Sequence, residues 1–267
     1  MKPVSILRHG FVGLVAVWSV FPFVWMAVAA TNSSADVIKG RTLPGGYLIE
    51  NIQAFMTAVD LPRVLWNSAI ISGVGTVLTL TVSALAGYGF EMFRSRFRER
   101  VFAGLMLMLS IPFAALMIPL FVMMAKAKLI NSYSAVILPM VASVFVIFYF
   151  RQATKAFPRE LRDAAKIDGL SEWQIFAFVY VPVMRSTFAA ATIIVFMANW
   201  NNYLWPLVVL QTNDKFTLTL AVASVGIGYT PDYGLIMVGA IAATLPTLLI
   251  FFLLQRRFVE GMLGAVK

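Results

Sequence analysis

The chain has 267 residues, of which 60% are hydrophobic and 12% are charged, with a net charge of +9 and a mean hydropathy of +0.85. Soluble domains carry about 25% charged residues, so this composition excludes an ordinary soluble or disordered protein and indicates a chain embedded in a membrane. The lack of cysteine excludes disulfides, Cys-based metal sites and a thiol nucleophile, and the single histidine excludes a multi-histidine metal centre.

Six apolar stretches follow one another along the chain. About 20 helical residues cross roughly 30 Å of hydrocarbon, and only helices and closed barrels satisfy the backbone there. The stretches lack the alternation of barrel strands. We therefore predict an all-α, polytopic membrane protein that forms a single transmembrane domain over residues 1–267. The six predicted transmembrane helices cover residues 11–30, 65–90, 101–125, 134–150, 186–210 and 233–255.

The first stretch has a basic start, as a signal peptide does, but its apolar run is longer than the roughly 7–15 residues of a signal core. We therefore expect it to be retained as a span. The six spans contain no Asp, Glu, Lys or Arg, which argues against a proton- or ion-coupled carrier, because such carriers bury ionisable groups in the membrane. Ser83 and Gly87, four residues apart in the second span, favour a close contact between helices.

The basic residues are distributed unequally between the two sides of this arrangement. If both termini share one side, that side holds 15 of the 21 Lys and Arg residues, and the other side holds six. Cytoplasmic loops are enriched in Lys and Arg. We therefore predict a multi-pass membrane protein with both termini in the cytoplasm. The spans are expected to contact membrane lipid. Nucleic acid is not an expected partner, because the membrane topology already explains the excess of basic residues.

The loop between the fourth and fifth spans, residues 151–185, has the clearest local pattern. Pro158 favours a helix start and Gly169 a helix end. Ser171 and Gln174 then match a capping box that begins a second helix, which Pro182 is expected to end. The pattern predicts two short helices, joined at Gly169, at or below the cytoplasmic surface of the membrane.

Each of these two helices has a distinct predicted face. Residues at helical spacing give the first helix a small, shallow face: Leu161, Ala164, Ala165 and Asp168. The corresponding stripe on the second helix is Trp173, Phe176, Ala177 and Tyr180. A hairpin that merely rests on lipid would need a large apolar face on both helices. We therefore favour docking into a groove of another protein and keep the lipid surface as the alternative.

The run Glu160–Ser171, followed by Val181 and Pro182, resembles the signature loop of permease subunits from binding-protein-dependent ABC importers. The alanine pair, the glycine four residues later and the hydrophobic–proline pair occur at the family's spacing, with Asp163 in place of the usual glutamate. Residues 200–207 and the C-terminal 257–267 resemble the carbohydrate-uptake branch, close to the maltose-type second permease and the glycerol-3-phosphate permease.

The resemblance implies the permease subunit of an ATP-driven importer for a di- or oligosaccharide or related carbohydrate. This chain would form half of the translocation pathway, and a second permease would complete a heterodimer. Two cytoplasmic ATPase subunits would bind ATP and Mg, and an extracytoplasmic solute-binding protein would deliver the sugar. The chain has no P-loop, so we expect no catalytic residue, cofactor or metal within it. The residues expected to couple it to the ATPase are Glu160, Asp163, Ala164, Ala165, Asp168, Gly169 and Ser171.

Further expectations concern the solute and the outer segments. Polar and aromatic groups either line the substrate pathway or form an interfacial aromatic belt: Asn201, Asn202, Tyr203 and Trp205. Segments 31–64 and 211–232 would face the binding protein, and the tail 256–267 would reach the ATPase or anchor at the membrane surface. The alternatives are an importer of glycerol-3-phosphate or another polyol derivative, a secondary carrier or channel, and a non-transporting membrane scaffold.

Overall fold

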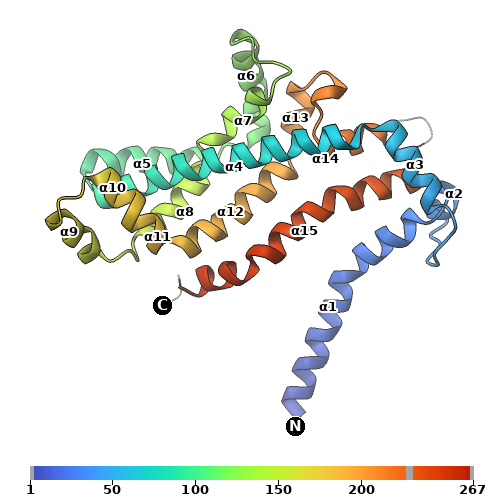
Figure 1. The fold of residues 1–267 in the computed structure, drawn as a ribbon, viewed down its shortest axis with the longest axis horizontal. Helices are drawn as coiled ribbons and strands as arrows, with labels where there is room; N and C mark the ends of the chain where they lie inside the picture. The colour runs from blue at the N-terminus through green and yellow to red at the C-terminus, as the bar shows by residue number, and fades with distance from the viewer. Residues whose placement is uncertain (1–2, 227–230, 265–267) are drawn as a thin grey trace. The chain divides into compact units, whose positions relative to one another are not determined.

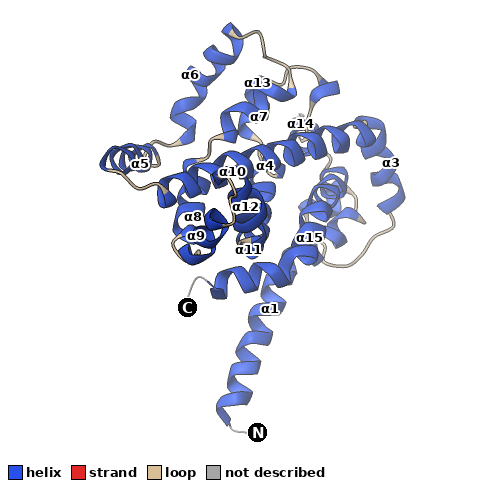
Figure 2. Cartoon of the chain, turned by 60° about the vertical axis from the view of Figure 1, so that its left-hand side comes forward, coloured by secondary structure: helices blue, strands red, loops and turns tan. Residues whose placement is uncertain are grey.

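The computed structural model describes residues 3–226 and 231–264, which form helices and connecting loops and contain no strand (Figures 1 and 2). This confirms the predicted all-α class. The chain divides into two compact units: unit 1 comprises Met1–Val64 and Leu218–Pro246, and unit 2 comprises Leu65–Thr217 and Thr247–Lys267. The single permease domain over residues 1–267 stays a prediction.

Unit 1 is organised around a buried amide side chain. Its helices are α1 (Pro3–Ala30), α2 (Ser34–Ile38), α3 (Leu48–Ala58), α14 (Leu218–Val225) and the first part of α15 (Tyr233–Gly264). Asn51 Nδ2 donates to the carbonyl oxygens of Ala30 at 2.8 Å and Asn32 at 3.0 Å. A Cβ on Gly234 would lie 2.5 Å from Asn51 Nδ2. A glycine is therefore needed where α15 begins beside the end of α1.

Unit 2 is a bundle around α4 (Leu61–Met92), which enters the unit at Leu65. Its other helices, in chain order, are α5 (Arg96–Met108), α6 (Phe113–Lys126), α7 (Tyr133–Val141), α8 (Val144–Thr154), α9 (Arg159–Ile167), α10 (Glu172–Ile175), the π-helical turn η1 (Phe176–Tyr180), α11 (Val181–Val183), α12 (Arg185–Trp200), α13 (Leu204–Val209), the 3₁₀ turn η2 (Asn213–Lys215) and the end of α15. Helices α8 and α12 pack together, and so do α5 and α8.

Helices α4 and α8 approach each other closely at Gly87. A Cβ at this position would lie 2.6 Å from Phe150 Cβ and 2.8 Å from the backbone nitrogen of Arg151. Phe150 itself is fully buried, in a cluster with Ala84, Val146 and two residues of α12. This confirms the close helix contact expected at Gly87.

Three helices are long and apolar enough to cross a membrane: Arg8–Ala30, Leu61–Met92 and Tyr233–Leu253. Three bent pairs meet the same criteria as broken spans. They are α5 with α6, bent by 103°, α7 with α8, bent by 42°, and Glu172–Val183 with α12, bent by 82°. Counted as one span each, they raise the total in the described residues to six, which agrees with the predicted number.

The third and fourth predicted spans, 101–125 and 134–150, are interrupted rather than continuous. The first breaks between α5 and α6, where Pro112 lacks an N–H and disfavours helical geometry in the residue before it. The second breaks at Ala142 and Ser143, and the Ser143 hydroxyl caps α8 by accepting from the N–H of Val146 at 3.4 Å.

The break after α7 leaves carbonyl groups that side chains from other helices satisfy. Pro139 cannot donate to the carbonyl of Ala135 four residues earlier, and the indole N–H of Trp205 donates to that oxygen at 2.9 Å. Likewise, Thr79 Oγ1 of α4 donates to the carbonyl of Met140 at 3.2 Å. The broken helix is therefore stabilised by its neighbours.

The fifth predicted span, 186–210, is also divided. Helix α12 ends at Trp200, residues 201–203 form a break, and α13 runs from Leu204 to Val209 and packs on α6 and α7. Sixteen residues of α12 rise about 24 Å, which is less than the hydrocarbon thickness. Pro206 lies in the first turn of α13, where its missing N–H costs little.

Charged groups lie just beyond the predicted end of the second span. Helix α4 continues past residue 90 to Met92, so that buried Glu91 belongs to it. The Glu91 carboxylate pairs with Arg94 and with the buried guanidinium of Arg151, 3.6 Å away. Arg151 also pairs with Glu99 of α5, and its guanidinium lies 4.0 Å from the centre of the Phe102 ring. One ionic cluster thus joins α4, α5 and α8.

Candidate functional site

The loop expected to couple the chain to a partner forms the predicted pair of helices. Helix α9 begins directly after Pro158 and is capped by Asp168. Gly169 has a φ of +82°, and its N–H donates to the carbonyl of Lys166 at 3.0 Å. The N–H of Leu170 donates to the carbonyl of Ala165, also at 3.0 Å. These two bonds form a Schellman motif, which confirms Gly169 as the helix stop.

The second helix also begins where the sequence predicts. The Ser171 hydroxyl accepts from the N–H of Gln174 at 3.4 Å, and the N–H of Ser171 donates to Gln174 Oε1 at 2.9 Å. This is a complete capping box, because each residue satisfies a backbone N–H of the other. Helices α9 and α10 therefore form a rigid hairpin whose ends are fixed by local hydrogen bonds. We call residues 159–174 the coupling hairpin.

Six of the seven expected coupling residues are exposed on this hairpin: Glu160, Asp163, Ala164, Asp168, Gly169 and Ser171. The seventh, Ala165, is buried. The predicted shallow face is thus split, because Ala165 packs inward whereas Ala164 and Leu161 stay open to solvent. Two large apolar side chains that the sequence analysis did not assign to an outward face are strongly exposed, Ile167 at 87% and Trp173 at 72%.

The predicted stripe on the second helix is wrong in its details. Trp173 is exposed, whereas Tyr180 is completely buried. The physical reason is that Phe176–Tyr180 is a π-helical turn, which inserts an extra residue and ends the 3.6-residue periodicity. Pro182 does not end the segment either, because it lies in the short turn Val181–Val183, and the chain bends only at Met184 before α12 begins.

Glu172 is a residue that the sequence analysis missed. Its carboxylate accepts from Arg162 Nη2 at 2.6 Å and Nε at 3.2 Å, from Lys166 Nζ at 2.8 Å, and from the Tyr88 hydroxyl at 3.3 Å. The carboxylate is thus held by two cations of α9 and by a hydroxyl of α4. Arg162 and Lys166, one turn apart on α9, were the available signal that an acidic partner lies nearby.

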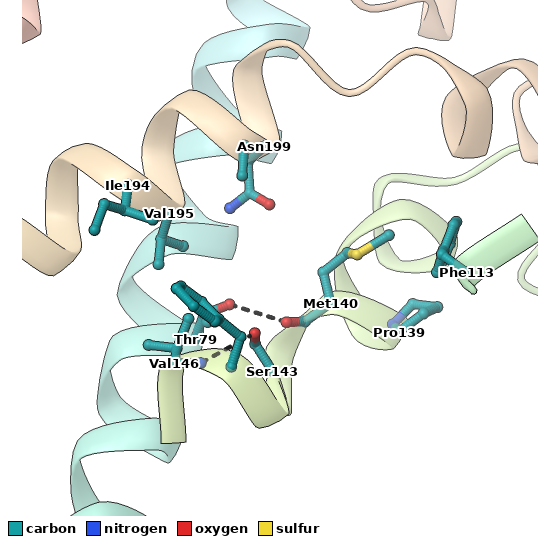
Figure 3. Close-up of a pocket in the computed structure, with 11 residues that line it drawn as sticks. Thr79, Phe113, Pro139, Met140, Ser143, Val146, Ile194, Val195 and Asn199 are labelled. Atoms are coloured by element: carbon teal, nitrogen blue, oxygen red, sulfur yellow. Dashed lines mark hydrogen bonds between the residues drawn. The ribbon is translucent and has the colours of Figure 1, made fainter. Parts of the chain in front are cut away.

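A separate pocket of about 210 Å³ opens between α4, α7, α8 and α12 in unit 2. Figure 3 shows Thr79, Ser143 and Asn199 among the residues at its edge, with the Thr79 hydroxyl bonded to the Met140 carbonyl. The remaining lining is apolar and includes Phe113 and Ile194, and no Lys, Arg, Asp or Glu contributes to it. This is a neutral pocket with a few hydrogen-bonding groups.

The residues expected in a substrate pathway lie near this pocket in sequence but do not line it. Asn201 is exposed, and Asn202 and Tyr203 are half-buried, in the break after α12. Trp205 is completely buried, with its ring edge-on to Phe113 and its N–H on the Ala135 carbonyl. The expected stacking face of Trp205 is thus covered. Asn199, which the sequence analysis passed over, contributes the amide: its Nδ2 lies 3.4 Å from Thr76 Oγ1.

Two of the expected contact segments, 211–232 and the tail 256–267, are only partly described, whereas 31–64 is described throughout. In 211–232, residues 227–230 lie outside the described residues. The C-terminal tail is helical through Gly264 as the end of α15, and residues 265–267 lie outside the described residues. Within the residues that the structure describes, no group of three His, Asp or Glu side chains is placed to hold a metal ion.

Residues 79–264 match the family described as binding-protein-dependent transport system inner membrane component. The chain is 60% identical to the lactose transport system permease protein LacG of Rhizobium radiobacter, over 98% of this chain and 96% of that protein. It is 36% identical to the arabinooligosaccharides transport system permease protein AraQ of Halalkalibacterium halodurans, over 98% and 96%. It is 32% identical to the sn-glycerol-3-phosphate transport system permease protein UgpE of Pectobacterium atrosepticum, over 96% and 94%.

Solved structures share the fold. A chain from a bacterial ABC transporter involved in the import of the acidic polysaccharide alginate superposes with a TM-score of 0.82, at 19% identity and 96% coverage of both chains. A chain of the MetNI methionine ABC transporter superposes with a TM-score of 0.59, at 17% identity, over 75% of this chain and 95% of that one. These similarities establish the arrangement of helices.

Proposed function

Because the chain belongs to the family of binding-protein-dependent transport system inner membrane components, we propose that it is the permease subunit of an ATP-driven importer for a disaccharide such as lactose. The observation that carries this proposal is the 60% identity to a lactose permease along nearly the whole of both chains. The chain spans the bacterial inner membrane several times. Both termini lie in the cytoplasm, as the excess of basic residues on that side indicates.

Transport requires partners that supply energy and cargo. A second permease completes the pathway as a heterodimer, two ATPase subunits bind ATP and Mg in the cytoplasm, and an extracytoplasmic binding protein delivers the sugar. The chain itself has no P-loop to bind nucleotide phosphates. We assign ATP hydrolysis to the partner subunits, and the contribution of this chain is to convert closure of the ATPase into movement of the spans.

The coupling hairpin is the surface that meets the ATPase. Its exposed carboxylates and small residues, among them Asp163, Ala164 and Gly169, allow close approach of another backbone. Ile167 and Trp173 project from the same hairpin with most of their surface exposed. Exposed large apolar side chains of this kind are typical anchors in a partner's pocket. We assign the docking contacts to this hairpin together with Glu160, Asp168 and Ser171, with Ala165 packed beneath them.

The neutral pocket of unit 2 supports an uncharged cargo. Sugars are bound through hydrogen bonds to hydroxyl groups together with apolar contact, and Thr79, Ser143 and Asn199 provide such groups among apolar walls. Asn201, Asn202 and Tyr203 follow at the end of α12 and extend the polar lining of the pathway. A phosphorylated cargo such as glycerol-3-phosphate would need a cation, and none lines this pocket.

Uptake into membrane vesicles tests this function. The chain is produced together with its second permease, ATPase and binding protein, and the uptake of labelled lactose is measured with and without ATP. We expect ATP-dependent uptake that disappears when this chain alone is omitted. Excess unlabelled lactose should compete, whereas glycerol-3-phosphate should not.

Two outcomes would contradict the proposal. Uptake driven by an ion gradient in the absence of ATP would indicate a secondary carrier. ATP-dependent uptake of labelled glycerol-3-phosphate, without uptake of labelled lactose or other neutral sugars, would assign the importer to a polyol phosphate.

A further inference from the structure

We propose that Glu172 is a positioning residue for energy coupling, which ties the coupling hairpin to the cytoplasmic end of α4 so that the two move as one body. The inference rests on the proposed function, since coupling has meaning only in an ATP-driven importer. It concerns a carboxylate that does not belong to the outward docking surface and that joins three separate helices.

The geometry places one acid at the meeting point of α9, α10 and α4. Glu172 is the first residue of α10, Arg162 and Lys166 lie one turn apart on α9, and Tyr88 lies near the end of α4. Arg162 makes two hydrogen bonds to the two carboxylate oxygens, at 2.6 and 3.2 Å. A forked contact of this kind fixes direction as well as distance. Arg162 thus orients the carboxylate within the hairpin, and the hairpin cannot rotate away from α4 without breaking the hydrogen bond from the Tyr88 hydroxyl to Glu172, which measures 3.3 Å.

These bonds are partly shielded from water. The side chains of Arg162 and Glu172 are 15% and 34% exposed, and the Arg162 guanidinium lies 5.0 Å from the centre of the Phe93 ring, just past the end of α4. Charge pairs in such surroundings are screened less than pairs on an open surface. The same cation thus contacts Glu172 on one side and an aromatic ring of the α4 terminus on the other.

A buried aromatic cluster lies beneath the ionic contacts. The Tyr88 ring contacts Phe176 and Tyr180, with ring centres 5.4 and 4.8 Å apart, and the Tyr180 hydroxyl is 2.7 Å from Thr154 Oγ1 of α8. Cores packed in this way shift between discrete arrangements and do not deform continuously. A displacement of the hairpin is therefore transmitted through this aromatic cluster, and Glu172 fixes the orientation of the hairpin relative to the cluster.

Helix α4 continues from this junction to the neutral pocket. Thr79, at the pocket edge, lies nine residues before Tyr88 on the same helix, about 14 Å along its axis. A displacement of the hairpin by the ATPase would thus reach the pocket through one continuous helix. Without the Glu172 contacts, the hairpin would still be able to bind the ATPase, but its motion would be transmitted less completely.

The test compares sugar imported per ATP hydrolysed in the complete transporter. In Glu172→Gln we expect this ratio to fall by about fivefold or more, the lower range of typical coupling between sites. The amount of ATPase copurifying with the membrane complex should be unchanged, because the outward docking surface is intact. Tyr88→Phe, which removes only the hydroxyl, should lower the ratio in the same direction.

Lys155→Gln is the matched control, because it removes an exposed charge from the same cytoplasmic loop outside the hairpin, and its ratio should equal that of the unsubstituted transporter. An unchanged ratio in Glu172→Gln would overturn the inference. A parallel fall in uptake and hydrolysis, with the ratio constant, would also overturn it, since this indicates mere loss of folded protein. Failure of the proposed function is separate, because the unsubstituted complex would then show no ATP-dependent uptake.

Discussion

Gly169 shows how a single backbone conformation fixes the coupling hairpin. Its φ of +82° lies in the left-handed region, and no other atom lies within 4 Å of the position that a Cβ would occupy. Space is therefore available for a side chain, and the cost of replacing the glycine is conformational, about 1–2 kcal/mol for an ordinary L-residue. Asparagine tolerates this region better than other residues do, whereas β-branched residues are severely disfavoured.

We therefore expect Gly169→Val to reduce sugar import per ATP hydrolysed, because it distorts the angle between α9 and α10, and Gly169→Asn to retain most of it. Paired assays of uptake and hydrolysis check this. If both variants were equally impaired, the cause would be crowding at the docking surface. If both were fully active, the turn geometry would not matter for coupling.

Trp205 acts as a donor in the core, and this has a measurable consequence. Trp205→Phe keeps an aromatic ring but leaves the Ala135 carbonyl without its indole donor, which should cost about 1–3 kcal/mol. We expect a lower thermal unfolding temperature of the detergent-solubilised complex and an unchanged KM for the sugar. A raised KM at unchanged stability would instead place the indole against the substrate.

At the scale of helices, the sequence analysis succeeds where signals act within one turn. Pro158, Gly169 and the pair Ser171–Gln174 specify the ends of α9 and α10 by contacts between near neighbours, and all are observed. The positions of helix breaks are harder to predict, because a proline by itself does not determine where a helix breaks. Pro119 and Pro139 both lie inside helices, but α7 ends two residues after Pro139, and its Ala135 and Met140 carbonyls accept from Trp205 and Thr79, which are far away in sequence.

The same distinction between local and long-range contacts explains which residues of the candidate site could be predicted. The outward residues of the hairpin follow from a local motif, but Glu172 becomes a junction only when α4 packs beside the hairpin, as Figure 1 shows. Tyr88 lies 84 residues from Glu172, and periodicity carries no information about such a contact. Asn199 was likewise missed because it follows an apolar run, and the substrate pathway was assigned to the polar residues that begin two positions later, at Asn201.

The contact between α4 and α8 allows a test with two glycines on one helix. A Cβ on Gly87 would overlap Phe150 and the Arg151 backbone, whereas nothing lies within 4 Å of a Cβ on Gly89. We expect Gly87→Ala to destabilise unit 2 by about 1–3 kcal/mol through overpacking. Gly89→Ala should be neutral or stabilising by up to about 1 kcal/mol.

Thermal unfolding of the purified complex, or its resistance to denaturant, distinguishes the two variants. Equal stability of Gly87→Ala and Gly89→Ala would contradict the close approach of the two helices. If the amount of sugar imported per ATP hydrolysed fell in Gly87→Ala but not in Gly89→Ala, this would indicate that the contact between α4 and α8 also changes during transport.

For the whole molecule, the distribution of basic residues predicts the orientation in the membrane, and the lack of cysteine makes this prediction easy to test by labelling. Single cysteines placed at exposed Lys126 and Lys155 lie on opposite predicted sides of the membrane. In intact spheroplasts we expect a membrane-impermeant maleimide to label Lys126→Cys only. Lys155→Cys should react after the membrane is permeabilised, and the cysteine-free parent should never react. The reverse pattern would invert the predicted topology.

The π-helical turn Phe176–Tyr180 holds one residue more than an ordinary helical turn. Because the extra residue is accommodated within that turn, its removal would restore ordinary winding and leave the segments before and after it in nearly the same phase. A deletion inside α12 would instead turn every later residue of that helix by about 100° and move Asn199 away from the pocket. We therefore expect single-residue deletions among related chains to fall in Phe176–Tyr180 and not in α12.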